Sequence, residues 1–317
     1  MAATAAVGEE ARAADGRRPV LGYAMVLVAG FLFGLNGAVS KVALTSGMSA
    51  LRLTEARSAG AWLGLTAYLL VVRPATIRLR PGEWWRLAIF GVVGVAFVQL
   101  FYFLSIQRLP IGIALLIQYL GPLFVAIWAV SFGHEHVRRR IWVALALSLV
   151  GLALMVQLWQ GVTLDGLGVV FALIAAVVFA VYLLLAEKEV AGRDSISLLA
   201  WGFFFATVFW TVAQPWWSFP ARTVGTTVSL QGRLETWHLP VWALVLWVMV
   251  LGAIVPFVLI VGALRHVSAT RVGIVAMLEP VVATIVAWIW LKESLAPAQL
   301  VGAAVVLCGI VLAQTSR

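Results

Sequence analysis

Ten long apolar runs, separated by short polar stretches, set the pattern of this sequence. The hydrocarbon core of a bilayer requires about 20 mostly apolar residues per helix, and each run approaches or exceeds that length. None of the runs alternates apolar and polar residues with a period of two, as barrel strands would. The pattern therefore predicts an all-α, polytopic membrane protein with ten transmembrane helices. The expected spans are residues 20–40, 51–72, 84–106, 109–132, 141–159, 166–186, 195–214, 240–264, 267–291 and 297–314.

The composition supports this class and excludes others. Hydrophobic residues make up 63% of the 317 residues and charged residues 11%, whereas soluble domains have about 45–50% and 25%. These values exclude a soluble globule and a disordered chain. The single cysteine, Cys308, excludes a disulfide or a thiolate metal cluster within the chain. The net charge of +9 indicates basic loops facing anionic lipid headgroups rather than a nucleic-acid partner.

The distribution of basic residues predicts the orientation. Residues 1–19 end in two arginines and a proline before a full-length apolar run, which indicates a cytoplasmic tail followed by an uncleaved first helix. With the N-terminus inside, 15 of the 22 basic residues fall on the cytoplasmic side and six on the outer side. This asymmetry predicts a plasma (inner) membrane protein with both termini in the cytoplasm. The longest loop, 215–239, then lies outside, and its Trp216, Trp217 and Trp237 are expected at the outer interface.

An internal repeat divides the chain into two halves, 20–159 and 166–314. Matching residues are separated by 158 positions near the end of each half and by 146 near its start. Because each half contains five spans, an odd number, the second half must enter the membrane from the opposite side. Such inverted repeats underlie alternating access in many secondary transporters. The matched residues are Pro122 with Pro280, Glu135 with Glu293, Gly151 with Gly309, and Phe33-Gly34 with Phe179-Ala180.

These repeated motifs resemble the EamA family of the drug/metabolite transporter superfamily over residues 20–314. The resemblance implies a ten-helix exporter that moves small metabolites out of the cytoplasm without ATP. The stretch from Gln118 to Pro122 is most similar to the threonine/homoserine exporter branch, and Arg57 matches an arginine that is common in the family. The other motifs that carry the resemblance are Glu135 after the fourth span, Glu279-Pro280 and Lys292-Glu293.

Glu279 is the first candidate for a functional residue. It lies at the centre of the ninth span, where insertion of a carboxylate costs about 2.5–3.5 kcal/mol. We expect it to couple transport to protons or to bind a substrate ammonium group; the alternative is a protonated side chain that clamps two helices together. Pro280 frees a backbone carbonyl one turn earlier and predicts a helix break, as does Pro122 in the fourth span.

Neutral polar residues at mid-membrane depth form a second candidate set. They would contact the substrate, or else they would form hydrogen bonds between helices, which are worth about 0.6 kcal/mol on average. The set comprises Asn36, Gln99, Tyr102, Gln118, Tyr119 and Tyr182.

Two further residues complete the candidate site. Arg57 in the second span could hold a substrate carboxylate, pair with Glu55, or extend outward beside Arg52. Trp201 in the seventh span could line an apolar cavity wall, or could pack against lipid or other helices. The glycine pairs at 30/34 and 60/64 are assigned to close helix packing.

The sequence carries no Walker A, HExxH or GxSxG motif, so no catalytic residue, cofactor or metal is expected. His134 and His136 form an HxH in a loop, which we interpret as solvated. The predicted function is export of small metabolites or amino acids by alternating access, with proton coupling or exchange, by a monomer or homodimer. A translocator of lipid-linked or amphiphilic substrates with the same fold is the alternative, and a membrane-embedded enzyme is a more distant one.

Overall fold

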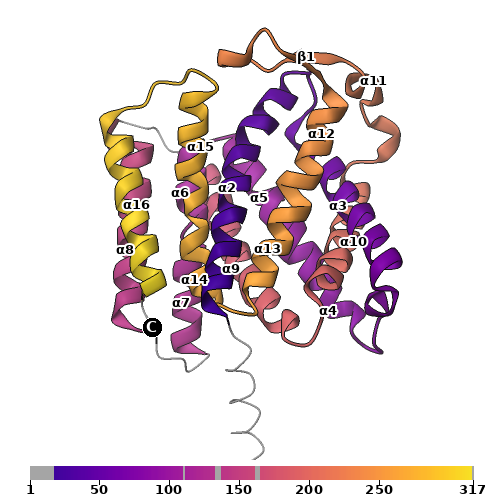
Figure 1. The fold of residues 1–317 in the computed structure, drawn as a ribbon, viewed down its shortest axis with the longest axis horizontal. Coiled ribbons are helices and arrows are strands. Elements are labelled where there is room, and N and C mark those ends of the chain that lie inside the picture. Colours follow the sequence, from indigo (N-terminus) through magenta and orange to yellow (C-terminus); the bar gives the residue numbers. More distant parts are fainter. Residues whose placement is uncertain (1–17, 110, 133–136, 161–164, 316–317) are drawn as a thin grey trace, which may run out of the picture.

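A computed structural model describes residues 18–109, 111–132, 137–160 and 165–315 of the chain (Figure 1). Within these ranges, nine helical segments are long and apolar enough to cross a membrane. The segments are Pro19–Leu44 (α2), Trp84–Ile106, Gly112–Ser131, Arg139–Val156 (α8), Gly166–Val190 (α9), Ser195–Ala213 (α10), Val241–Ala263, Ala269–Ile289 and Pro297–Thr315 (α16). The fold class is therefore the expected one, a helical membrane bundle. The predicted tail is described only from its residue 18.

The remaining expected span is helix α3, Ala50–Val72, which at 23 residues is long enough to cross a bilayer. Its charged residues Arg52, Glu55 and Arg57 make it the least apolar of the ten. The Ser49 hydroxyl accepts a hydrogen bond from the Arg52 backbone N–H and caps its N-terminus. Aspartates cap two other helices in the same way, Asp165 for α9 and Asp194 for α10.

Four of the spans are interrupted, and the interruptions recur in the two halves of the chain. Two spans contain a π-helical segment in which the backbone hydrogen-bonding pattern widens, and two others break near their middle. The spans with a π-helical segment form the first pair. One consists of α4 (Trp84–Ile89), η2 (Phe90–Phe97) and α5 (Val98–Ile106), and the other of α12 (Val241–Met249), η6 (Val250–Ile254) and α13 (Val255–Ala263). The second pair is α6 (Ile111–Gln118) and α7 (Gly121–Ser131), matched by α14 (Ala269–Ala276) and α15 (Leu278–Ile289).

The last helices of the two halves, α8 and α16, lie side by side (Figure 1). A Cβ atom built on Gly151 would meet Val306 at 2.7 Å, and one built on Gly309 would meet Ser148. The residue numbers rise in one helix as they fall in the other, so the helices are antiparallel. Moreover, the repeat offset of 158 positions relates Gly151 to Gly309 and Ser148 to Val306. The two contacts therefore exchange under the repeat, as they must around a two-fold axis perpendicular to the helices.

The first helix of each half packs into the other half. Helix α2 contacts α12, α13, α14 and α15, whereas α9 contacts η2, α5, α6 and α7. Small residues allow the close approach: a Cβ on Gly34 would meet Val282 at 2.6 Å and the Glu279 carbonyl oxygen at 2.8 Å. A Cβ on Gly30 would likewise meet Leu278. The glycine pair of α2 thus places this helix against the turn that carries Glu279.

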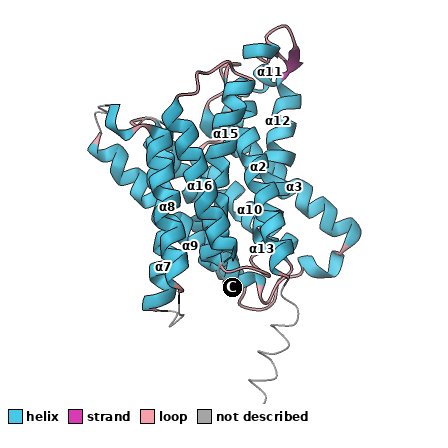
Figure 2. Cartoon of the chain, turned by 60° about the vertical axis from the view of Figure 1, so that its left-hand side comes forward, coloured by secondary structure: helices cyan, strands magenta, loops and turns pink. Residues whose placement is uncertain are grey.

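Polar and irregular segments cover the two ends of the bundle. Figure 2 shows a small strand pair above one end, formed by β1 (Thr227–Ser229) and β2 (His238–Pro240). The sequence pattern did not predict this hairpin. Its segment is tied to the end of α15, because the Arg233 backbone N–H donates to the Trp290 carbonyl at 2.8 Å and the Trp290 indole donates to the Leu230 carbonyl at 3.0 Å. Short helical turns complete the ends: η4 (Trp216–Ser218), α11 (Ala221–Val224) and η5 (Gly232–Leu234) beside the hairpin, η1 (Pro74–Ile77) opposite, and η3 (Leu158–Gln160).

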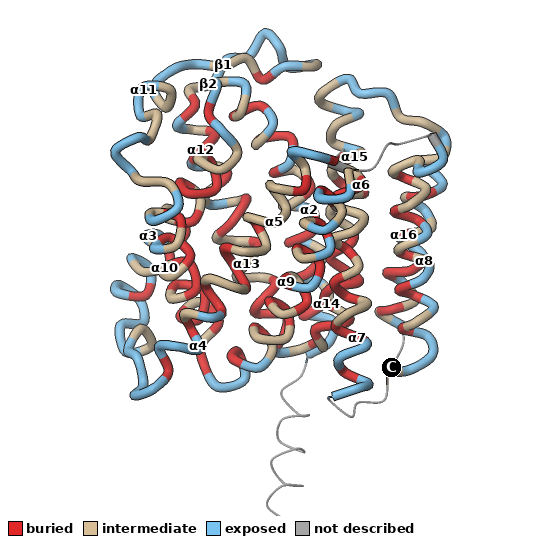
Figure 3. The backbone as a smooth tube through the Cα atoms, turned by 180° about the vertical axis from the view of Figure 1, so that it is seen from behind, coloured by how far each residue is buried: buried red, intermediate tan, exposed pale blue. Residues whose placement is uncertain are grey.

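Burial follows the membrane-like layering of the bundle. Figure 3 shows exposed residues at both ends and buried residues along the helices between them. Large apolar side chains nevertheless remain exposed on the outer faces of helices, for example Val71 at 84% and Val212 at 81%. Exposed apolar surface of this kind is what a lipid-facing helix requires.

Candidate functional site

Glu279 lies in the first turn of α15, next to the break at Met277 that separates α14 from α15. Its carboxylate oxygen Oε2 accepts a hydrogen bond from the Tyr119 hydroxyl at 2.9 Å. Tyr119 belongs to the matching break between α6 and α7 in the other half. The two interrupted spans therefore meet at these two side chains.

The same tyrosine satisfies a backbone group that Pro280 leaves open. In a regular helix the Ala276 carbonyl would accept from the N–H of residue 280, but proline has none. The Tyr119 hydroxyl lies 3.2 Å from this carbonyl oxygen and takes the place of the missing donor. Pro280 thus marks the helix break that the sequence predicts, and Pro122 lies correspondingly in the first turn of α7.

The Tyr119 hydroxyl has one hydrogen and two acceptors within reach. If Glu279 is ionised, Tyr119 donates to the carboxylate, and the Ala276 carbonyl shares that hydrogen or lacks a donor. If Glu279 is protonated, it can donate to the Tyr119 oxygen, and Tyr119 donates to Ala276. Both protonation states of Glu279 therefore have a hydrogen-bonding arrangement in the same geometry.

Arg57 faces Glu279 without forming an ion pair. The two charges interact electrostatically, but no described carboxylate lies within 4.0 Å of the guanidinium group, and its buried Nε has no partner. The alternative pairing with Glu55 is not formed, because Glu55 accepts from Arg52 at 2.6 Å. The two opposite charges thus interact at a distance without forming an ion pair.

Two of the predicted tyrosines extend this region. The charge of Glu279 acts on Tyr102, and Tyr102 in turn interacts with Tyr119. The ring of Tyr182 stacks on Phe179 at 6.4 Å between centroids, and Phe179 contacts the Tyr119 ring edge-on at 6.2 Å. The structure therefore brings Tyr102, Tyr119 and Tyr182 into one cluster with Glu279.

Several predicted site residues carry buried polar atoms without a hydrogen-bond partner among the residues that the structure describes. Unsatisfied buried polar atoms are uncommon in folded proteins, and each lost hydrogen bond costs about 1–3 kcal/mol. Six of the twelve such atoms in the described part of the chain belong to the candidate set, where a substrate or water molecules could supply the partners. The atoms are Asn36 Oδ1, Arg57 Nε, both amide atoms of Gln99, Gln118 Oε1 and the Tyr182 hydroxyl.

The π-helical segments contact two of these residues in matching ways, which sequence reasoning did not foresee. A Cβ atom on Gly252 in η6 would collide with the Asn36 amide, and one on Gly94 in η2 would lie 3.4 Å from the Tyr182 ring. Gly94 and Gly252 are 158 positions apart, and Asn36 and Tyr182 are 146 apart, which are the two offsets of the repeat. The recurrence of glycine at this offset was a signal that could have found them.

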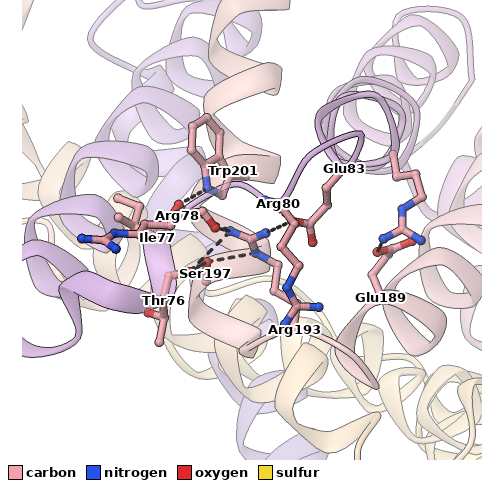
Figure 4. Close-up of polar contacts among 10 residues, drawn as sticks. Thr76, Ile77, Arg78, Arg80, Glu83, Glu189, Arg193, Ser197 and Trp201 are labelled. Carbon is pink, nitrogen blue, oxygen red and sulfur yellow. Dashed lines mark hydrogen bonds and ion pairs between the residues drawn. The ribbon is translucent and has the colours of Figure 1, made fainter.

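The structure places Trp201 away from this cluster. Its indole N–H donates to the Ile77 carbonyl at 2.9 Å (Figure 4). This contact lies at the end of the bundle opposite the hairpin (Figure 1). There Arg193 donates to the Glu83 carboxylate at 2.5 Å and to the Ser197 hydroxyl at 3.0 Å. Burial raises the pKa of Glu83, but hydrogen bonds from Arg193 and the Arg80 backbone outweigh it and lower the pKa below its ordinary value. The predicted loop residues His134, Glu135 and His136 lie outside the described residues.

The long apolar helices and the interrupted spans define a multi-pass membrane protein. The chain belongs to the EamA-like transporter family, whose model matches residues 20–157 and 166–315. The resemblance seen in the sequence motifs is thereby confirmed.

Relatives and one solved structure agree with this assignment. The chain is 28% identical to the threonine/homoserine exporter RhtA of Escherichia coli K12 over 80% of this chain and 76% of that protein. It is 27% identical to an uncharacterized transporter of Archaeoglobus fulgidus, with coverages of 72% and 74%, and 26% identical to the protein PecM of Dickeya dadantii, with coverages of 79% and 82%. A crystal structure at 17% identity superposes with a TM-score of 0.71 over 91% of this chain and 96% of that chain, which shows a common fold. Together these findings support a membrane transporter or exporter of small metabolites.

Proposed function

We propose that this protein exports small amino acids from the cytoplasm by alternating access. The observation that carries the proposal is the pair Glu279 and Arg57: their charges interact, but Arg57 Nε is buried without a partner and Glu279 accepts from Tyr119 instead. An α-amino acid presents an ammonium group and a carboxylate, which match these two charges. The family is one of transporters, which favours transport over catalysis as the role of this site.

The unpartnered neutral polar atoms of the predicted site residues favour a small polar side chain on the substrate. Asn36, Gln99 and Gln118 offer unpartnered amide atoms that could bind a hydroxyl group. Several relatives, at about 28% identity, are threonine/homoserine exporters, and both of those amino acids carry a hydroxyl. We therefore infer a hydroxylated amino acid as the substrate of this chain.

Glu279 is the proposed proton-coupling residue. The Tyr119 hydroxyl has one hydrogen-bonding arrangement with Glu279 and Ala276 for each protonation state of Glu279. Glu279 can therefore bind and release a proton while its hydrogen bond with Tyr119 is kept. Protonation would weaken its attraction for a substrate ammonium, so that a proton and the substrate compete for one carboxyl group and proton binding favours substrate release. This competition is the basis of exchange between protons and substrate.

The proposed mechanism uses residues 20–159 and 166–314 as two inverted repeats that rock about the central site. The contacts between α8 and α16, which exchange under the repeat, support such an axis. The excess of basic residues in one set of loops supports N- and C-termini in the cytoplasm and an inner-membrane location. In that orientation the segment 215–240 lies outside.

Transport by purified protein in proteoliposomes tests the proposal. We expect radiolabelled threonine or homoserine to move against its gradient when a pH difference is imposed, and this driven flux to fall at least tenfold in Glu279→Gln. Glu293→Gln is the matched control, because Glu293 forms an exposed ion pair with Lys41 at the end of the bundle. Equal pH-driven flux in Glu279→Gln and wild type would remove the coupling role. A failure of wild-type protein to move either amino acid would overturn the proposed substrate class.

A further inference from the structure

A small basic pocket lies at the end of the bundle opposite the hairpin, away from the Glu279 cluster. It has a volume of about 310 Å³. It lies at the turn where the chain enters the apolar span Trp84–Ile106. The residues that line it are Arg80, Pro81, Gly82, Glu83, Trp85 and Arg86.

The wall of this pocket is held in a fixed shape by residues of α10 and the loop before it. Arg193 donates to the carbonyl oxygens of Thr76, Ile77 and Arg78 at 3.2–3.5 Å, and Ser197 donates to the Thr76 carbonyl at 2.6 Å (Figure 4). These contacts fix the backbone from which the basic side chains project. Gly82 adopts a positive φ of 74°, which favours glycine and sharpens the turn.

The positive charges of the pocket are only partly compensated. The Glu83 carboxylate is buried, and it accepts from Arg193 and from the Arg80 backbone N–H. Arg86 lies 3.5 Å from Glu189 but keeps 44% of its side chain exposed. The exposed Arg80 side chain has no hydrogen bond or ion pair with any residue that the structure describes. It interacts with the charge of Glu83 only at longer range. The accessible face of the pocket is therefore cationic.

Two exposed tryptophans set the depth of the pocket in the membrane. Trp84 and Trp85 are 60% and 50% exposed and begin the apolar span. Tryptophan concentrates at the level of the lipid headgroups, where its ring contacts acyl chains and its N–H remains in a polar layer. We therefore expect the arginines beside them at the depth of the phosphate groups.

We propose that Arg80, Arg86 and Trp85 bind the phosphate headgroup of an anionic membrane phospholipid such as phosphatidylglycerol. The guanidinium groups would contact the phosphate oxygens, since the planar guanidinium presents paired N–H donors that can bind two oxygens of one phosphate. Trp85 would pack against the glycerol backbone and the first methylene groups. The site lies outside the candidate transport site, so it does not depend on the proposed substrate or coupling.

Lipid binding to the purified full-length protein tests the site. The protein in a neutral detergent is titrated with phosphatidylglycerol or phosphatidylcholine, and bound lipid is counted by native mass spectrometry. Each arginine near an anionic surface contributes about 1 kcal/mol, so R80Q/R86Q should weaken phosphatidylglycerol binding about 30-fold. R222Q/R233Q, a double arginine variant at the opposite end of the bundle, should bind as wild type does. R80K/R86K should retain most of the preference, and a thermal melt establishes that each variant is folded.

Two arms of the experiment separate the sources of phosphate. Inorganic phosphate and glycerol 3-phosphate are added as competitors to the lipid-bound protein. Weak competition supports a lipid site, because the acyl chains and Trp85 contribute to binding, whereas full displacement at millimolar concentration would assign the pocket to a soluble phosphate compound. Equal affinity of wild type and R80Q/R86Q, or equal binding of phosphatidylcholine, would overturn the proposal.

Discussion

Tyr119 and Glu279 form a hydrogen bond that joins two matching helix breaks, 160 residues apart in the chain. Because the hydroxyl also reaches the Ala276 carbonyl that Pro280 leaves without a helical donor, one phenol connects the carboxyl group to the backbone of its own break. A change in the protonation of Glu279 would therefore alter the hydrogen bonding of the break as well as the charge of the site.

This relationship predicts the effect of Tyr119→Phe. The variant keeps the ring and its contact with Phe179 but removes the hydroxyl that reaches both Glu279 and the Ala276 carbonyl. Loss of an interhelical hydrogen bond in a membrane protein costs about 0.6 kcal/mol and rarely more than about 1.7 kcal/mol, so the protein should remain folded. We expect the pH-driven flux of threonine to fall at least tenfold, with a small change in melting temperature. Wild-type flux with an unchanged pH profile would show that the hydroxyl takes no part in coupling.

Arg57 provides a second prediction, which concerns recognition of the substrate carboxylate. A hydrogen bond to a charged group contributes about 1.5–3 kcal/mol, so Arg57→Gln should raise the KM for homoserine about 10- to 100-fold. The matched probe is the amine that remains when the carboxylate of homoserine is removed. Wild-type protein should strongly prefer homoserine over this amine in competition assays, and Arg57→Gln should lose most of the preference. Arg57→Lys is the charge-conserving control. If Arg57→Gln still discriminated between homoserine and the amine, carboxylate recognition would be assigned to another residue.

The two π-helical glycines offer a matched pair of substitutions. Gly252→Ala would force the Asn36 amide to move, whereas Gly94→Ala would place its Cβ 3.4 Å from the Tyr182 ring, an ordinary contact distance. Overpacking of a well-packed interior costs about 1–3 kcal/mol. We therefore expect Gly252→Ala to lower substrate affinity and melting temperature, and Gly94→Ala to behave almost as wild type. Similar transport by the two variants would mean that the position of Asn36 is not critical.

The sequence predicted the parts of this site that depend on residue type and spacing. Proline removes a backbone donor wherever it stands in a helix, so the breaks at Pro122 and Pro280 follow from the sequence directly. A carboxylate in the centre of an apolar run is costly in lipid, which singled out Glu279. The repeat was visible because glycine and proline recur at one offset.

Other features depend on side-chain direction and backbone hydrogen bonding, which single-residue patterns do not specify. The π-helical segments η2 and η6 have the composition of ordinary apolar helix, and the change in their hydrogen bonds leaves no mark on periodicity. Trp201 lies on a spanning helix, but its indole is directed to the Ile77 carbonyl at the end of the bundle. Arg193 is one of the 15 basic residues that the charge count assigns to the cytoplasmic side, and no pattern in the sequence indicates that it is buried against Glu83.

The buried pair Glu83 and Arg193 gives the last prediction, on the pH dependence of stability. The two side chains are only 4% and 6% exposed, and removal of one partner from a buried pair costs about 3–5 kcal/mol. Because hydrogen bonds from Arg193 and the Arg80 backbone outweigh burial and hold the folded-state pKa of Glu83 below the ordinary 4.5, the ionised carboxyl contributes its full stabilisation above that pH. The contribution is lost as the pH falls below 4.5 and through the folded-state value, where Glu83 becomes protonated. Melting temperatures in detergent should therefore be lower for Glu83→Gln than for wild type at pH 7, and the difference should shrink in acid. Glu235→Gln, at an exposed pair with Lys292, should differ little from wild type at any pH. A difference that stays constant down to pH 3, or that widens, would mean that the carboxyl of Glu83 is not the titrating group.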